Sequence, residues 1–205
     1  MINKVKSKIK NLLSINENDQ RIVLFNPGEK EPDLRVVGLF SDVVDEKVSE
    51  IVTGLIYMNE VNKASKEKRD IDFYISTYGG NADDMFALYD IMKVIEQDTD
   101  ISTIGMGKVM SAGVLILAGG TKGKRKIGRN CRVMLHSVIA GNHGSLHSLV
   151  NEMEAIQDLQ ELYIDRLVED TKMTKKQLKR LLEQKVNIYL SAEQAVEYGI
   201  ADIIV

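Results

Sequence analysis

The stretch IDFYISTYGGNADDMFALYDIMKVIE, residues 71–96, contains a strand pattern, a glycine turn and a helix pattern in direct succession. IDFYIS predicts a strand, TYGG predicts a turn that needs glycine conformations, and the remainder predicts a helix that starts on an Asn81 cap. DISTIGMG then predicts a second strand, and SAGVLILAGG predicts a buried helix that stops at two glycines. Because strand and helix alternate in this way, we expect an α/β fold.

The flanking sequence extends this pattern in both directions. RIVLFN and RVVGLF predict strands on either side of a turn, and the stretch from Asp45 predicts a helix with an apolar pattern at Val48, Ile51, Leu55, Ile56 and Met58. TKGKRKIG reads as a basic turn, and CRVMLHS as a strand. Residues 146–170 predict a long amphipathic helix, TKKQLKRLLEQ a helix capped by Thr174, SAEQAVEYG a short capped helix, and IADIIV a final strand. We find no internal repeat and no second domain.

The composition is that of a globular protein of one domain. The chain has 205 residues, of which 44% are hydrophobic and 28% charged. A net charge of −3 gives no reason to expect a nucleic-acid partner, and no apolar run is long enough to span a membrane. The single Cys131 excludes an intrachain disulfide, which is typical of a reducing compartment. We therefore expect a cytoplasmic protein.

The N-terminal stretch MINKVKSKIKNLL alternates lysines with apolar residues, whereas a signal peptide keeps its charges ahead of an unbroken apolar run. We interpret it as a flexible arm or an assembly helix rather than as a membrane-surface helix. The chain has three histidines and no carboxylate or cysteine pattern at ligand spacing, so we expect no metal site and no cofactor. His143 and His147 are expected to be exposed to solvent.

Three features are candidate catalytic groups, and each has a structural alternative. Gly79 and Gly80 either let a backbone approach a ligand and present its N–H groups, or form an ordinary turn. Ser111 is either a nucleophile beside the unpaired N–H groups of a helix start, or a simple helix cap. His136 ends an apolar strand, and it is either a catalytic base or a core histidine. Each alternative is the commoner case when its motif is taken alone.

Taken in order, however, the motifs ISTYGG, MFALYDIM, STIGMG, MSAGVLILAGGTKGKR, NCRVMLH and YLSAEQAVEYGIAD resemble the proteolytic subunits of the Clp protease, the ClpP family. The 25 residues from Ser111 to His136 are similar to the family's own spacing. The resemblance covers roughly Arg35 to Asp202. It implies a divergent N-terminal segment, residues 1–34, which is an axial entrance region or a flexible arm, and a ClpP-like serine protease domain, residues 35–205. It also implies a ClpP/crotonase-like fold of βαβ units with a projecting long helix for the contact between rings.

The resemblance assigns roles residue by residue. Ser111 matches the nucleophile, His136 the general base, and the backbone N–H groups of Gly80 and Ala112 the oxyanion hole. Where the family has an aspartate before its closing motif, this chain has Asn187. We expect Asn187 to orient His136 but to catalyse poorly.

Other departures from the family pattern are Tyr78 in place of the proline before the two glycines, and Ser137 and Val138 in place of the usual Gln-Pro. The segment before Arg35 does not match the family region that helps to dock the unfoldase. The identity of any unfoldase therefore stays open.

The resemblance further implies a homo-oligomer of two stacked heptameric rings whose inner chamber cleaves unfolded polypeptides to short peptides. The long helix and the segment SVIAGNHGS would form the contact between the rings. Unfolding would be done by a partner AAA+ ATPase, since this chain has no P-loop. Two alternatives stay open: a weakly active or non-catalytic ring subunit, which Asn187 favours, and an acyl-CoA hydratase or isomerase of the related crotonase fold.

Overall fold

The computed structural model describes residues 13–14, 23–24, 34–141, 143–183 and 187–205. The chain divides into two compact units, residues 1–34 and Arg35–Val205. In the first unit, β1 (Leu13–Ser14) pairs antiparallel with β2 (Val23–Leu24), and β2 falls within the predicted strand RIVLFN. The prediction of an arm or helix for the first residues lies outside the described part of the chain.

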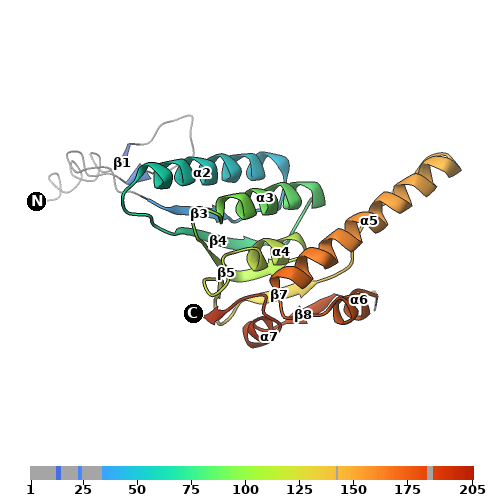
Figure 1. Ribbon diagram of the computed structural model, residues 1–205. Helices are drawn as coiled ribbons and strands as arrows, with labels where there is room; N and C mark the ends of the chain where they lie inside the picture. Colours follow the sequence, from blue (N-terminus) through green and yellow to red (C-terminus); the bar gives the residue numbers. More distant parts are fainter. Residues whose placement is uncertain (1–12, 15–22, 25–33, 142, 184–186) are drawn as a thin grey trace, which may run out of the picture. The chain divides into compact units, whose positions relative to one another are not determined.

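The second unit is built on a mostly parallel sheet, which confirms the α/β prediction (Figure 1). Five strands follow the order β3 (Val36–Leu39), β4 (Ile71–Thr77), β5 (Ile101–Met110), β6 (Lys126–Ile127) and β9 (Ile203–Ile204). The long strand β5 also pairs in parallel with β7 (Arg132–Leu135), and β7 pairs antiparallel with β8 (Ile188–Leu190). The sequence analysis assigned β6 to a basic turn and did not identify β8.

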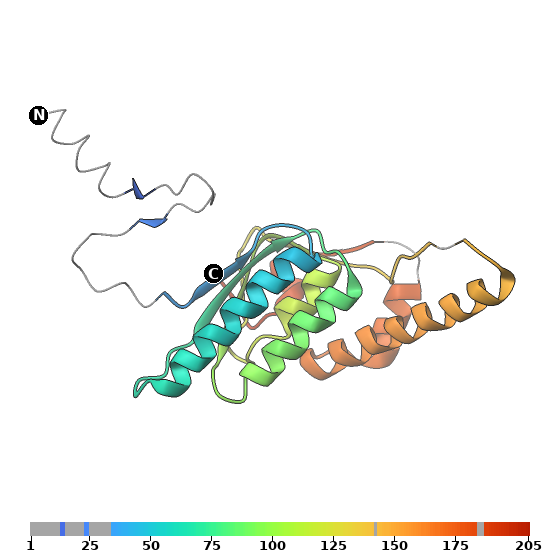
Figure 2. The same cartoon turned by 90° about the horizontal axis from the view of Figure 1, so that it is seen from above.

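Three helices lie side by side over the sheet: α2 (Asp45–Ala64), α3 (Ala82–Ile95) and α4 (Ala112–Ala118) (Figure 2). The Asn81 side chain caps α3 as predicted, because it accepts hydrogen bonds from the Asp83 and Asp84 amides at 2.7 and 3.2 Å. Every residue of α4 is buried. In α2, Val48, Ile51, Leu55 and Met58 are buried, whereas Ile56 of the same predicted pattern is 43% exposed because it lies off their common face.

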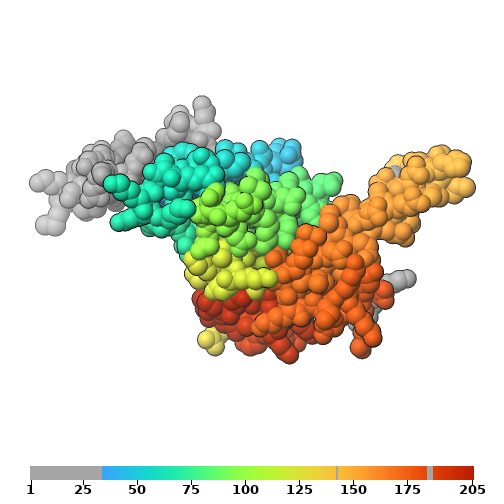
Figure 3. Space-filling model, viewed as in Figure 1, coloured from blue at the N-terminus to red at the C-terminus, as the bar shows by residue number. Residues whose placement is uncertain are grey.

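The long helix α5 (Leu146–Asp170) has the predicted bounds, and it is followed by α6 (Lys175–Glu183) and α7 (Ala192–Glu197). The C-terminal half of α5 packs on the core through Tyr163, Ile164 and Leu167. Its N-terminal half projects from the rest of residues 35–205 (Figures 1 and 3). Several apolar side chains are exposed there: Leu146, Leu149, Val150 and Met153.

Candidate active site

Ser111 lies in the sharp turn between β5 and α4, and its backbone is strained. Its φ of 55° and ψ of −124° make it the one non-glycine residue with positive φ among the described residues. Such a conformation costs on the order of 1–3 kcal/mol and persists where surrounding structure enforces it. Here the Ser111 amide donates to the Met134 carbonyl at 2.8 Å, and the Ser111 carbonyl accepts from the Tyr163 hydroxyl at 3.3 Å.

The Ser111 side chain does not cap α4, although Ser111 occupies the N-cap position. The simple helix-cap alternative is therefore wrong. A serine on a strained strand-to-helix turn, with its hydroxyl free of the helix, has the backbone arrangement of a nucleophile elbow. The glycine that normally lies two residues before such a serine is Val109 here, and a neighbouring segment of the chain packs closely against the turn.

That neighbouring segment is the Gly79–Gly80 turn after β4. A Cβ added to Gly79 would lie 2.5 Å from Ser111 Cβ and 3.0 Å from Ser111 Oγ, so a side chain there would displace the serine. A Cβ on Gly80 would collide with the Val43 backbone. Both glycines also have positive φ, 105° and 156°. The turn is held by hydrogen bonds from the Val43 amide to the Gly79 carbonyl and from the Asn81 amide to the Val43 carbonyl, at 2.8 and 2.9 Å.

Two backbone amides beside Ser111 are free to bind a ligand. Within the described residues, neither Gly80 N–H nor Ala112 N–H donates to a protein acceptor. Ala112 is the first residue of α4, so its N–H is one of the amides that a helix leaves unpaired, and it lies at the positive end of the helix dipole. Both residues line the same cavity as Ser111.

His136 follows β7 and reaches this cavity because of the pairing between β5 and β7. Met110 is the register partner of Met134, so Ser111 and His136 each lie just beyond the ends of neighbouring parallel strands. His136 is half-buried, and its Nδ1 atom is buried without a hydrogen-bond partner in the described part of the chain. No hydrogen bond joins His136 to Ser111 among the described residues. Catalytic hydrogen bonds are often loose before substrate binds.

The cavity has a volume of about 430 Å³ and brings together four of the five predicted site residues: Gly80, Ser111, Ala112 and His136. Its remaining walls come from the start of α3, from the segment after β7 and from one face of α5.

Asn187 is the fifth predicted residue, and it does not line the cavity. It is exposed and immediately precedes β8. In the β7–β8 pairing, Leu135 is opposite Ile188, so continuing the same register places Asn187 opposite His136. Residues opposite each other in an antiparallel pair have Cβ atoms about 5 Å apart. Asn187 is thus the neighbour of His136, but it does not bond the buried Nδ1 atom.

The comparison with known protein families matches residues 30–205 to the family described as Clp protease. The chain belongs to the Clp protease family. This favours a protease over the acyl-CoA enzyme considered as an alternative. The mixed α/β unit with its parallel sheet is consistent with the fold of that family.

Two curated relatives illustrate the similarity. The ATP-dependent Clp protease proteolytic subunit 1 of Leifsonia xyli subsp. xyli (strain CTCB07) is 33% identical over 168 residues, which cover 82% of this chain and 81% of the relative. The ATP-dependent Clp protease proteolytic subunit 2 of Bifidobacterium longum (strain NCC 2705) is 29% identical over 171 residues, covering 83% of this chain and 79% of the relative.

Two residues of this Clp protease family member that contribute to the cavity were missed by the sequence analysis. The Tyr163 hydroxyl donates a hydrogen bond to the Ser111 carbonyl. Glu152 lines the cavity from the same face of α5, nearer the N-terminus of the helix. Their spacing from Ile156 and Leu159 is helical, so the sequence pattern contained the signal. It did not indicate which side of the helix faces Ser111.

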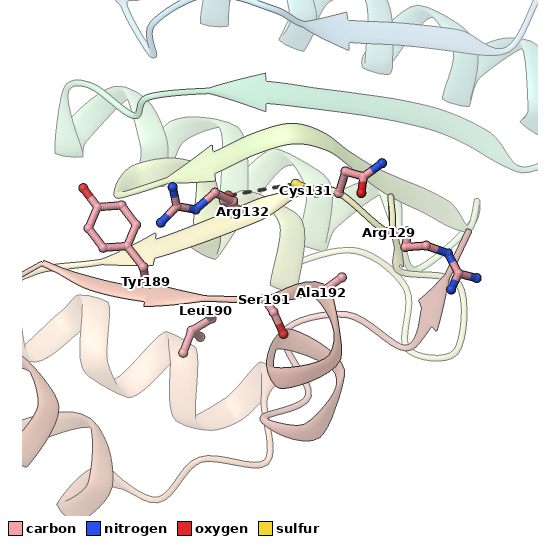
Figure 4. Close-up of a pocket in the computed structure, with 8 residues that line it drawn as sticks. Arg129, Cys131, Arg132, Tyr189, Leu190, Ser191 and Ala192 are labelled. Atoms are coloured by element: carbon pink, nitrogen blue, oxygen red, sulfur yellow. Dashed lines mark hydrogen bonds between the residues drawn. The ribbon is translucent and has the colours of Figure 1, made fainter.

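A second cavity of about 300 Å³ lies between the start of β7 and the end of β8 (Figure 4). Cys131 and Tyr189 line it, and the Arg132 guanidinium stacks 4.8 Å from the centre of the Tyr189 ring. Burial raises the pKa of the Cys131 thiol to about 11, so at neutral pH the thiol is protonated and is a poor nucleophile. None of the predicted site residues lines this cavity, and we do not regard it as catalytic.

Among the described residues, no group of three histidine, cysteine, aspartate or glutamate side chains is placed to hold a metal ion. His143 and His147 are exposed, as expected. No helix in the described part of the chain is long and apolar enough to cross a membrane.

Proposed function

We propose that this chain is a ClpP-type serine endopeptidase subunit in which Ser111 is the nucleophile and His136 the general base. The observation that carries the proposal is the strained backbone of Ser111, which leaves its hydroxyl uncapped in a cavity that His136 shares. Strain of this kind is retained at functional sites rather than in ordinary helix caps.

In the proposed reaction, His136 removes the hydroxyl proton as Ser111 Oγ attacks a peptide carbonyl. The negative oxygen of the tetrahedral intermediate accepts hydrogen bonds from the Gly80 and Ala112 amides, each worth roughly 10²–10³ in rate. The intermediate collapses to an acyl-enzyme as His136 returns the proton to the leaving amine. Water then hydrolyses the ester by the same proton transfers. Asn187 does not bond His136 Nδ1 in this structure; in the proposed reaction its amide oxygen accepts the imidazole N–H and so orients the ring.

The proposal includes assembly into two stacked heptameric rings that enclose a chamber, with a partner AAA+ ATPase that unfolds the substrates. Both relatives above carry the name of an ATP-dependent proteolytic subunit. The exposed apolar side chains on the projecting half of α5 support an assembly, because they leave an apolar surface that one subunit does not cover. A cytoplasmic location is part of the same proposal.

A non-catalytic ring subunit is the less favoured alternative. It rests on Asn187 alone, whereas the names of both relatives describe proteolytic subunits. A fluorophosphonate probe separates the two, since it forms an adduct only with an activated serine.

We expect mass spectrometry of the probed, folded protein to find one adduct, on Ser111. Ser111→Ala should abolish labelling and hydrolysis of a fluorogenic peptide, while Ser148→Ala, which changes an exposed serine on α5, should keep both. Labelling that persists unchanged in Ser111→Ala would contradict the proposal, and labelling unchanged in His136→Ala would contradict the assigned base.

A further inference from the structure

Two carboxylates, Asp83 and Glu152, are among the described residues that line the Ser111 cavity. No lysine or arginine of the described residues lines it. Neither carboxylate takes part in an ion pair with a described residue. Within the described residues, the cavity lining therefore has a negative charge that no lining cation offsets. Both carboxylates are exposed to solvent, and together they attract cations and repel anions.

Glu152 belongs to the face of α5 that looks toward Ser111. Glu152, Ile156, Leu159 and Tyr163 are spaced as one helical stripe, and all four line the cavity. Tyr163 fixes the inner end of the stripe by its hydrogen bond to the Ser111 carbonyl. With a rise of 1.5 Å per residue, Glu152 lies on the order of 16 Å along the helix axis from Tyr163. At the end of the stripe farthest from Tyr163, the cavity is thus lined by a carboxylate, where the helical pattern alone would lead one to expect an apolar side chain.

Asp83 lies on the opposite side, in the first turn of α3. Its charge is partly offset by the positive end of the α3 dipole. Glu152 has no such compensation, because it lies in the interior of α5. Glu152 therefore contributes more than Asp83 to the negative potential of the cavity.

Most of the other side chains in the cavity wall are apolar, including Met85, Phe86, Val138, Ile156 and Leu159. Lysine and arginine have the matching chemistry, since their methylene stems pack on apolar surface while the cationic heads reach a carboxylate. A leucine of the peptide would pack on the apolar walls but would not pair with the carboxylates. A glutamate of the peptide would be repelled by both carboxylates.

We propose that this cavity selects peptides with a lysine or arginine within a few residues of the cleaved bond, and that Glu152 determines this specificity. An extended peptide spans about 3.3 Å per residue, so the axial separation of about 16 Å between Glu152 and Tyr163, which bonds the Ser111 carbonyl, corresponds to about five positions. The inference rests on the proposed function, because it takes the Ser111 cavity as the place where peptide binds.

The first test measures binding without turnover. Fluorescein-labelled peptides that differ only in one position, Lys, Gln or Glu, are titrated with Ser111→Ala protein and followed by fluorescence anisotropy. We expect Lys peptides to bind about three- to tenfold more tightly than Glu peptides at one or more positions, as for a partly exposed charge pair. Adding Glu152→Gln should bring this ratio close to one, whereas Glu154→Gln, an exposed glutamate on the same helix that does not line the cavity, should leave it unchanged.

The second test compares kcat/KM for the same peptides in the wild-type chain, Glu152→Gln and Glu154→Gln. The preference for Lys over Glu should fall in Glu152→Gln alone. A Lys-to-Glu ratio near one at every position, a ratio that Glu152→Gln does not change, or no binding of any peptide would overturn the inference. A charge preference in binding combined with no hydrolysis by the wild-type chain would instead contradict the proposed function and leave the binding inference supported.

Discussion

At the scale of single residues, the site depends on backbone conformations more than on side-chain hydrogen bonds. Ser111 is held in a strained turn by the Met134 carbonyl and the Tyr163 hydroxyl, and Gly79 fits against its side chain only because it has no Cβ. His136, in contrast, has a buried Nδ1 atom without a partner. An unpaired buried nitrogen leaves the ring tautomer poorly fixed, and the residue best placed to correct this is Asn187, by its register opposite His136.

We therefore predict that Asn187→Asp raises peptidase activity by at least about tenfold. A carboxylate would fix the tautomer and stabilise the imidazolium that forms as Ser111 loses its proton, whereas an amide has no charge and can present its NH₂ instead. The reverse change, aspartate to asparagine, costs about 10⁴ in turnover in a serine protease triad. Peptide hydrolysis rates of wild type, Asn187→Asp and Asn187→Ala decide the matter. Equal rates in all three would show that Asn187 is not the third member of the triad.

At the scale of the elements, the ion pair of Arg125 and Asp202, beside β6 and β9, connects the sheet to two helices. The guanidinium of Arg125, just before β6, forms two hydrogen bonds with the Asp202 carboxylate at 2.6 and 2.8 Å. It also donates to the carbonyls of Ala118 and Asp170 at the ends of α4 and α5. Burial by itself raises the pKa of the Asp202 carboxyl, but the hydrogen bonds and charge of Arg125 outweigh this and hold the pKa below its usual range. Arg125 thus links the start of β6 to the C-terminal ends of α4 and α5.

Because of the Arg125–Asp202 ion pair, we predict that the free energy of unfolding depends on pH. Because the pKa of Asp202 is lower in the folded than in the unfolded chain, its contribution is complete above the unfolded value near 4 and is lost as the pH falls through the folded value. Asp202→Asn should lower the free energy of unfolding at pH 7 by about 3 kcal/mol, since it leaves buried Arg125 without its carboxylate. Its difference from wild type should shrink below about pH 3.

Urea unfolding at one fixed protein concentration measures both effects, with Asp98→Asn as the matched control. Asp98 pairs with Lys63 at 3.2 Å, but both side chains are more than 40% exposed, so its loss should change the free energy of unfolding by less than about 1 kcal/mol. A difference between Asp202→Asn and wild type that stays constant from pH 7 to pH 3 would contradict the assigned pKa direction.

At the scale of the whole molecule, α5 contributes both to the candidate active site and to an exposed apolar surface. The stripe that lines the Ser111 cavity runs from Glu152 to Tyr163, and Leu149 and Met153 are exposed on the part of the helix that projects (Figure 3). Ile156 and Leu159 of the same helix are half-buried and line the cavity. The apolar residues of α5 therefore divide between the two roles.

We predict that the protein is an oligomer and that Met153→Glu dissociates it. Light scattering at working concentration should give a mass many times the 23.0 kDa of the chain, and a charge on this 58% exposed methionine should not unfold the subunit but should be costly to bury in an interface. Glu154→Gln on the same helix is the control and should keep the oligomer. A stable wild-type monomer would contradict both the assembly and the enclosed chamber.

The sequence by itself determined the order of strands and helices, because hydrophobic period, caps and glycine stops are local signals: the bounds of α2 and α5 and the Asn81 cap were predictable from them. It also predicted Ser111 and His136 as a pair, through motifs whose order and spacing resemble one family. It could not identify β6 and β8, since such short strands are stabilised by partners distant in sequence rather than by their own pattern. Only the tertiary structure decided that Ser111 is strained and uncapped, that β5 and β7 bring His136 to it, and that Glu152 faces the same cavity. These depend on strand register and on which side of a helix meets the sheet, and both are set by packing between residues far apart in the chain.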